Sequence, residues 1–393
     1  MTSESAIAIK PFRIEVPQGE LDGLRQRLAR TRFAPDIPGV GWAHGTPTAW
    51  LRDMVAYWQD GFDWRTWEEK LNAYPQYTTV IDGQRLHFLH IPSPESGATP
   101  LVLLHGWPGS FVEFLRVVEP LTNPAAHGGR AGDAFHLVIP SLPGFTFSGP
   151  TSEPGWDAGR MARAIAALMA ALGYNRYGVQ GGDWGGLIAA YLGQFDADHV
   201  TGIHINSAVF GFHPQGEISG DERALLTEAE QKRLEHRKHI DTDGNGYFQL
   251  QATRPQTVAA ALSDSPVGQL AWIGEKFESW SHEDSPIDRD IVLLQVMLYW
   301  LTNTSASSAR IYYESTHSRL YPSLVEVPVG VAVFARDTAI RRYGEQMYDI
   351  VHWSEFDRGG HFPALEVPDL LVDDVQVFFA RVRNAEAGDH EVT

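Results

Sequence analysis

The sequence predicts an α/β fold in which a mostly parallel central sheet carries a helical cap insertion and a helical arm at its N-terminus. Strand-like segments alternate with helix-like segments over residues 76–206, and the alternation resumes over 320–393. Such alternation is typical of a parallel sheet covered by helices on both faces. Residues 207–319 change to long polar helical segments, which we expect to form a cap over the carboxyl edge of the sheet. Residues 1–75 are expected to form the arm and to pack on core and cap.

The individual elements follow from hydrophobic spacing. In the arm, leucines and tryptophans recur every three or four residues, which indicates amphipathic helices. Two strands, Tyr77–Ile81 and Gln84–Ile91, are expected to join through a hairpin turn at Asp82-Gly83. The tail after Arg383 is expected to be mobile. The remaining expected strands are 101–104, 136–139, 177–180, 199–205, 327–334 and 350–353, and the expected helices are 159–172, 187–192, 291–301 and 368–382.

Composition limits the class of partner. The chain has 393 residues, a formal net charge of -18 and no cysteine. The acidic balance argues against a nucleic-acid or anionic-membrane surface and favours a neutral or cationic small molecule. Without cysteine there is no disulfide, thiolate metal site or cysteine nucleophile, and neither metal nor cofactor is expected. No signal peptide pattern and no apolar run of about 18 residues is present, so we expect a cytoplasmic protein. The sequence is also compatible with a homo-oligomer.

A glycine-rich hexapeptide, Gly-Gly-Asp-Trp-Gly-Gly at 181–186, lies between a predicted strand and a predicted helix. This is the layout of a nucleophile elbow, with Asp183 where many hydrolases carry serine. Glycines at 181 and 185 let the backbone bend sharply without a Cβ clash, and the helix amides beyond Asp183 favour negative charge. The alternatives are an aspartate that caps the helix and a dinucleotide-binding loop, but that loop requires glycine at position 183.

The aspartate narrows the chemistry to alkyl transfer. A serine that attacked a saturated carbon would leave an ether, which water and a histidine do not readily cleave. A carboxylate is already ionised near neutral pH and leaves an ester, which a histidine-activated water can hydrolyse. The elbow therefore predicts an epoxide or an alkyl halide as the substrate class.

Other catalytic groups are expected on loops that follow further strands. The segment His-Gly-Trp-Pro-Gly at 105–109 follows a predicted strand, so the amides of Trp107 and Trp184 would form an oxyanion hole. His361, in a late glycine-rich loop, is the candidate base, and Asp337 is the candidate acid that orients it. The alternatives are His352 and His317 for the base and Glu345 and Asp349 for the acid.

Opening an epoxide also requires a proton donor for the ring oxygen. A tyrosine phenol, with a pKa of about 10, stays protonated at neutral pH and can reach the site from the cap. The residues alone do not choose among the candidates, which are Tyr247, Tyr299, Tyr312 and Tyr313.

Together these residues resemble the epoxide hydrolases of the microsomal and juvenile-hormone type, in a soluble bacterial form with the α/β-hydrolase fold. The resemblance implies that Asp183, Asp337 and His361 are nucleophile, acid and base. It also implies that Tyr247 and Tyr312 are the ring-opening tyrosines. The microsomal type has glutamate as its acid, where this chain has Asp337. The matching segments are Pro-Phe at 11–12, Tyr-Pro-Gln-Tyr at 74–77, His-Gly-Trp-Pro-Gly-Ser at 105–110, Gly-Gly-Asp-Trp-Gly at 181–185, Ser-Asp-Ser-Pro-Val-Gly at 263–268 and Arg-Gly-Gly-His-Phe at 358–362.

The sequence therefore predicts cofactor-independent hydrolysis of an apolar or aromatic epoxide to a vicinal diol, through an ester on Asp183. By resemblance, the role is in natural-product biosynthesis or in detoxification. One alternative is a haloalkane dehalogenase, which shares the aspartate elbow and would hold the halide with Trp184 and another indole. A second alternative is a catalytically silent protein that binds an apolar ligand on the same fold.

Overall fold

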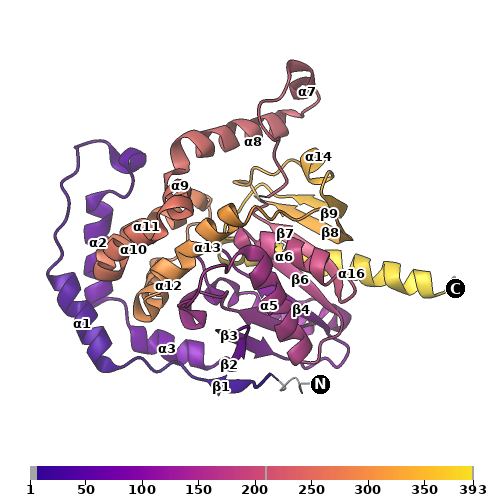
Figure 1. Ribbon diagram of the computed structural model, residues 1–393, viewed down its shortest axis with the longest axis horizontal. Coiled ribbons are helices and arrows are strands. Elements are labelled where there is room, and N and C mark those ends of the chain that lie inside the picture. The colour runs from indigo at the N-terminus through magenta and orange to yellow at the C-terminus, as the bar shows by residue number, and fades with distance from the viewer. Residues whose placement is uncertain (1–6, 209, 392–393) are drawn as a thin grey trace.

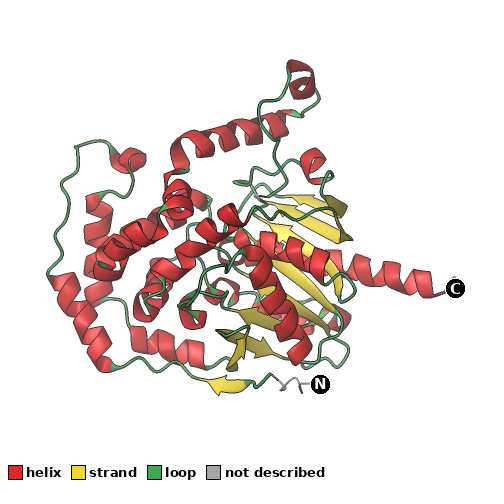
Figure 2. Ribbon diagram, viewed as in Figure 1, coloured by secondary structure: helices red, strands yellow, loops and turns green. Residues whose placement is uncertain are grey.

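The computed structural model describes residues 7–208 and 210–391. Its centre is a nine-stranded sheet in the order β1-β2-β3-β5-β4-β6-β7-β8-β9, shown in Figure 1 and Figure 2. Neighbouring strands from β5 to β9 are parallel, whereas the pairs that involve β1, β2 and β3 are antiparallel. The predicted α/β fold with a mostly parallel sheet is confirmed. The strands are β1 Lys10–Phe12, β2 Gln76–Ile81, β3 Gln84–Ile91, β4 Thr99–Leu104, β5 Phe135–Pro140, β6 Tyr177–Gly182, β7 Val200–Asn206, β8 Val325–Val333 and β9 Tyr348–Glu355.

Helices cover both faces of the sheet. On β7, Gly202 lies against Phe378 of α16, whereas the next residue, Ile203, lies against Gly193 of α6. Because successive strand residues point to opposite faces, α6 and α16 cover opposite faces. The helices are α1 Gln18–Ala29, α2 Thr48–Asp60, α3 Trp64–Asn72, α4 Val118–Thr122, α5 Ala158–Ala171, α6 Trp184–Phe195, α7 Gly220–Ala224, α8 Glu228–His239, α9 Gly246–Thr253, α10 Pro255–Asp264, α11 Pro266–Trp280, α12 Arg289–Thr302, α13 Ser305–Ser318, α14 Arg341–Gly344, α15 Pro363–Glu366 and α16 Pro368–Glu391.

The carboxyl ends of four parallel strands meet at one edge of the sheet. In the pairing register, Leu104 at the end of β4 lies opposite Gly181 of β6, and Asn206 at the end of β7 lies opposite Gly182. Ala332 of β8 pairs with the same Asn206. The loops that leave this edge are therefore brought together although they are far apart in sequence.

The helices α7 to α13 follow β7 in the chain. In Figure 1, α9 to α13 stand together beside the sheet with α1 and α2 along their outer side, whereas α7 and α8 extend away at the top of the view. The arm packs closely on α10 and α11. A Cβ at Gly274 of α11 would lie 2.6 Å from the ring of Trp50 in α2. Arg27 of α1 donates a hydrogen bond to the carbonyl of Asp264 in α10 at 2.6 Å. The boundaries of the four predicted parts of the chain stay a prediction.

One local feature differs from the expectation, and another is confirmed. Strand β1 pairs with β2 inside the predicted helical arm, because three residues with a proline carry no alternation signal. Helix α16 continues beyond Arg383 to Glu391, and residues 392–393 lie outside the described part, so the mobility of this tail stays a prediction. Arg383 donates to Asp133 at 2.6 Å, which ties this helix to the core. The predicted hairpin turn is present, with positive φ at Asp82 and Gly83.

Candidate active site

The strand-to-helix turn at Asp183 has the geometry of a nucleophile elbow. Asp183 has φ 54° and ψ -126°, a conformation that non-glycine residues rarely adopt, and its side chain does not cap α6. The helix-capping interpretation is therefore wrong. Glycine is needed on either side for space: a Cβ at Gly181 would lie 2.5 Å from the carbonyl oxygen of Gly185, and a Cβ at Gly185 would lie 2.0 Å from that of Leu104.

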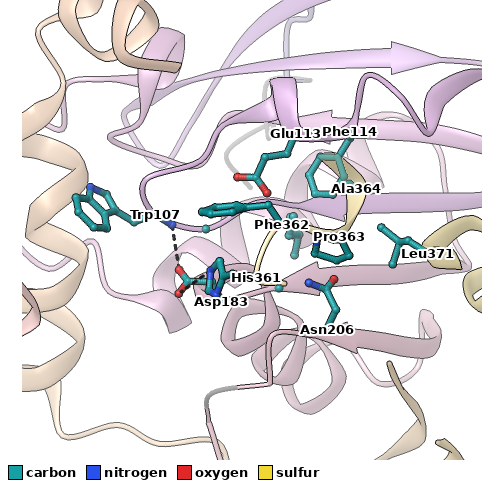
Figure 3. Close-up of a pocket in the computed structure, with 13 residues that line it drawn as sticks. Trp107, Glu113, Phe114, Asp183, Asn206, His361, Phe362, Pro363, Ala364 and Leu371 are labelled. Atoms are coloured by element: carbon teal, nitrogen blue, oxygen red, sulfur yellow. Dashed lines mark hydrogen bonds and ion pairs between the residues drawn. The ribbon is translucent and has the colours of Figure 1, made fainter. Parts of the chain in front are cut away.

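Two backbone amides face the Asp183 carboxylate. The amide of Trp107 donates to its Oδ1 at 3.0 Å (Figure 3), and the Trp184 amide also stabilises its negative charge. A Cβ at Gly106 would lie 2.3 Å from the same oxygen, so glycine lets the carboxylate sit against this loop. Burial raises the pKa of Asp183 to about 6 against the opposing effect of the two amides. The carboxylate is therefore ionised at neutral pH.

His361 lies beside this carboxylate, in the loop between β9 and α15. Its Nε2 is 3.7 Å from Asp183 Oδ2. The loop is held by the amide of His361, which donates to the carbonyl of Trp280 at 3.0 Å, and by Ser207 Oγ, which donates to the carbonyl of His361 at 2.7 Å. Burial lowers the pKa of His361 to about 4. The imidazole is therefore neutral at pH 7 and able to accept a proton.

Asp337 follows β8 and lines the same large cavity as His361. Its Oδ2 accepts from the amide of Ala208 at 3.2 Å and its Oδ1 from that of Ala339 at 3.0 Å. Burial raises the pKa of Asp337 against these amides. Among the contacts of the described residues, no hydrogen bond joins Asp337 to His361. The alternative acids lie elsewhere, because Glu345 pairs with Arg341 at the surface and Asp349 is exposed.

Two of the four candidate tyrosines, Tyr247 and Tyr312, line the cavity, which has a volume of about 910 Å³. The ring of Trp107 stacks on Tyr247 with centroids 5.3 Å apart, and the ring of Trp184 meets Tyr312 edge-on at 4.8 Å. Burial is the main cause that raises the pKa of both phenols. The hydroxyl of Tyr312 is buried and has no hydrogen-bond partner among the described residues. A hydroxyl in this state can donate to a ligand in the cavity.

The other candidates lie away from this cavity. Tyr299 donates to the carbonyl of Gly109 at 2.7 Å. Tyr313 lies at the surface, where its ring stacks on that of His317, one of the two alternative candidates for the base. His352, the other alternative base, is buried on β9, and its Nε2 lies 2.8 Å from Asp374 Oδ1 of α16. Of the sequence candidates, the fold therefore brings one histidine, His361, and two tyrosines, Tyr247 and Tyr312, to the large cavity.

Several residues that line the cavity were not predicted from the sequence, among them Trp42 and Lys276. Trp42 comes from η1 (Gly41–His44) in the arm, and its ring meets Trp50 edge-on at 5.4 Å. Lys276 of α11 is 5% exposed, with Nζ 4.4 Å from the ring centroid of Tyr247. Neither position shows a local signal, because only the packing of arm and cap helices brings them to the cavity. The wall also contains Phe210, Phe248, Trp272 and Trp280.

Among the described residues there is neither a candidate metal site nor a helix that could span a membrane. Within 7–208 and 210–391, no group of three or more histidine, aspartate and glutamate side chains could hold a metal ion. In the same part of the chain, no helix is long and apolar enough to cross a membrane.

Comparisons with known proteins agree with this geometry. The family model described as "Epoxide hydrolase N terminus" matches residues 9–114, and the one described as "alpha/beta hydrolase fold" matches residues 99–271. A provisionally named epoxide hydrolase of Stigmatella aurantiaca is 44% identical over 382 residues, which cover 95% of this chain and 86% of that protein.

Two solved structures share the whole architecture. The Aspergillus niger epoxide hydrolase has a TM-score of 0.85 and 34% identity, with coverage of 97% of this chain and 98% of that chain. The juvenile hormone epoxide hydrolase of the silkworm Bombyx mori has a TM-score of 0.88 and 31% identity, with coverage of 98% and 97%. The chain therefore belongs to the epoxide hydrolase family and is a hydrolase with the α/β-hydrolase fold.

Proposed function

We propose that this protein hydrolyses an epoxide to a vicinal diol through a covalent ester on Asp183. One observation carries the proposal: an ionised carboxylate, held by two amides, lies 3.7 Å from a neutral imidazole. Both groups open into a cavity that also contains two buried tyrosines. A carboxylate attacks a strained carbon and leaves an ester, which a histidine and water can cleave.

In the first step, Asp183 Oδ2 bonds to an epoxide carbon and the ring C–O bond breaks. Tyr247 and Tyr312 donate hydrogen bonds to the departing oxygen, and one of them gives up its proton. The raised pKa of both phenols keeps them protonated beforehand, so they serve as general acids. The product of this step is a hydroxyalkyl ester with Oδ1 as its carbonyl oxygen.

In the second step, a water oxygen bonds to Asp183 Cγ while His361 takes one of its protons. The negative charge that develops on Oδ1 is stabilised by the amides of Trp107 and Trp184, each worth about 3 kcal/mol at comparable sites. The diol oxygen leaves with the proton from His361. The second proton of the water stays on the new Asp183 carboxyl group and then passes to the tyrosine that lost its proton in the first step, which restores the enzyme.

Asp337 is the proposed partner of the imidazolium formed in this step. Its carboxylate shares the cavity wall with His361 and gains charge stabilisation from backbone amides. The aromatic wall, which includes Trp42 and Trp272, favours an apolar or aromatic epoxide, because such rings bury large apolar area.

Two variants test the ester route. Asp183→Ala should abolish diol formation, whereas His361→Ala should accumulate an ester that adds the substrate mass to the protein. His317→Ala, which changes an exposed histidine of α13, is the matched control and should behave as the unaltered enzyme. A single turnover in oxygen-18 water should label Asp183 and leave the diol unlabelled. Label in the diol, or halide release from haloalkanes with no diol from styrene oxide, would contradict the proposal.

A further inference from the structure

A second, smaller cavity adjoins the reacting groups (Figure 3). The centre of a water molecule can occupy about 10 Å³ of this cavity, so the cavity has room for about one water molecule. Asp183, His361, Glu113 and Asn206 form its polar wall, and the remaining side chains around it are apolar. None of the described tyrosines lines it, so it is distinct from the space where an epoxide would bind.

The reaction needs a water molecule that the substrate does not displace. An apolar epoxide that fills the large cavity expels water from it, yet ester hydrolysis requires a water beside His361 Nε2 and Asp183 Cγ. A small polar cavity that touches both residues outside the substrate's space meets this requirement.

Glu113, in η2 (Phe111–Phe114), presents a carboxyl group to this cavity. A Cβ at Gly109 would lie 1.2 Å from Glu113 Oε1, so glycine at this position makes room for the carboxyl group. Tyr299 holds that glycine by donating to its carbonyl at 2.7 Å. Burial, with the negative charge of Asp183, raises the pKa of Glu113 well above its ordinary value. A carboxyl group offers an acceptor oxygen in either protonation state, so Glu113 can accept a hydrogen bond from a water in this cavity.

Asn206, at the end of β7, lies on another part of the same wall. Its Oδ1 accepts from Gln180 Nε2 at 2.6 Å, and its Nδ2 donates to Ser207 Oγ at 3.2 Å. Ser207 Oγ in turn donates to the carbonyl of His361 at 2.7 Å, which couples the amide to the loop of the base. Because an amide nitrogen carries two hydrogens, one donor of Asn206 is left for a water.

We propose that Glu113 and Asn206 hold the water that hydrolyses the Asp183 ester, a positioning role that rests on the proposed function. The water gives one hydrogen bond to His361 Nε2 and one to Glu113, and it accepts one from Asn206. Its remaining lone pair is free to form the bond to Asp183 Cγ. As that bond forms, the proton on the first hydrogen bond passes to His361.

Separate measurement of the two chemical steps tests this role. Glu113→Met removes the hydrogen bond at similar volume, and ester hydrolysis should slow about tenfold or more while ester formation stays within about twofold. Glu113→Gln keeps an acceptor oxygen and should restore most of the rate. Asn206→Ala should also slow hydrolysis alone. The rates come from rapid-quench single turnovers with styrene oxide, with the ester followed by intact-protein mass spectrometry.

The outcomes separate this role from the proposed function. A wild-type enzyme that never forms an ester on Asp183 would overturn the function itself. Wild-type ester, together with unchanged hydrolysis in Glu113→Met or with both steps slowed equally, overturns the water-holding role alone. Should Glu113→Met fail to fold, unchanged hydrolysis in Asn206→Ala overturns it equally. Glu119→Met, on the exposed side of α4, is the control and should match the wild type in both steps.

Discussion

At the scale of single residues, the site depends on a carboxylate that is both buried and charged. Burial disfavours the charge of Asp183, and the amides of Trp107 and Trp184 only partly compensate for it. The same burial keeps His361 neutral, since its pKa is lowered to about 4. An ionised carboxylate and a neutral imidazole can therefore coexist at neutral pH, which the proposed two-step reaction requires.

The charge of Asp183 should cost folding stability. Its pKa is about 6 in the folded protein against an ordinary 3.8, so at pH 7 the ionised form destabilises the folded state by up to about 3 kcal/mol. Asp183→Asn should abolish turnover and raise the free energy of unfolding. The gain should be full above pH about 6 and vanish below pH about 4. Urea unfolding across this range measures it, and the exposed Asp349→Asn should show no such gain.

The two chemical steps should differ in their pH dependence. Ester formation should fall as pH drops through about 6, because protonated Asp183 is no longer a nucleophile. Ester hydrolysis should persist until pH about 4, where His361 becomes protonated and stops acting as a base. Stopped-flow single turnovers measure the pH dependence of ester formation, and pH jumps on preformed ester measure that of ester hydrolysis. The same apparent pKa for both steps would show that Asp183 and His361 titrate together and would contradict this prediction.

The two cavity tyrosines should act on ring opening alone. Tyr247→Phe with Tyr312→Phe should slow ester formation about 100-fold or more, because the departing oxygen loses both donors. Hydrolysis of ester already formed should change little. The matched control is Tyr313→Phe, which alters an exposed tyrosine of the same helix as Tyr312. An equal loss of the rate of ester formation in Tyr313→Phe would contradict the proposed role of Tyr247 and Tyr312.

At the scale of elements, the elbow depends on the close packing of α6 against the loop after β4. Gly185 lies so near the backbone of Leu104 that a side chain has no room, and backbone atoms cannot swing away as a side chain could. The turn at Asp183, the loop that carries the Trp107 amide and the strand register are thus packed as one unit. Gly186, one residue later, faces Ile205 at an ordinary distance.

Two neighbouring glycine variants distinguish this packing from helix propensity. Gly185→Ala should destabilise the fold by about 1–3 kcal/mol and abolish turnover, because its Cβ overlaps the carbonyl oxygen of Leu104. Gly186→Ala should be neutral or stabilising, since alanine favours a helix and its Cβ is 3.4 Å from Ile205. Urea midpoints and turnover of both variants provide the measurement. Equal effects at the two positions would contradict the packing argument.

At the scale of the whole molecule, α16 is joined to the sheet by a buried polar cluster away from the active site. Asp374 of α16 lies 2.9 Å from His204 Nε2 on β7 and 2.8 Å from His352 Nε2 on β9. Burial opposes the charge of Asp374, but hydrogen bonds from His204, His352 and Ser354 outweigh it and lower its pKa well below the ordinary range. The cluster therefore fixes the closing helix across two strands.

Loss of this carboxylate should weaken the fold without touching the chemistry. Asp374→Asn should lower the free energy of unfolding at pH 7 by about 1.5–3 kcal/mol, the worth of charged hydrogen bonds. Because the folded pKa is depressed, the contribution is present above pH about 4 and is lost as pH falls further. Thermal unfolding from pH 3 to 8 should show the two proteins converging in acid. The exposed Asp369→Asn on the same helix is the control.

The sequence by itself predicted the sheet and the elbow at Asp183, because strand periodicity and glycine spacing are local signals. The role of Asp183 as the nucleophile stays a prediction. It also indicated His361 through its glycine-rich loop. The choice of Tyr247 and Tyr312 came from resemblance and then from the cavity, since nothing local distinguishes them from Tyr299. Trp42 and Glu113 had no sequence signal at all. The tertiary structure alone decided their places, because they are set by the packing of segments far apart in the chain.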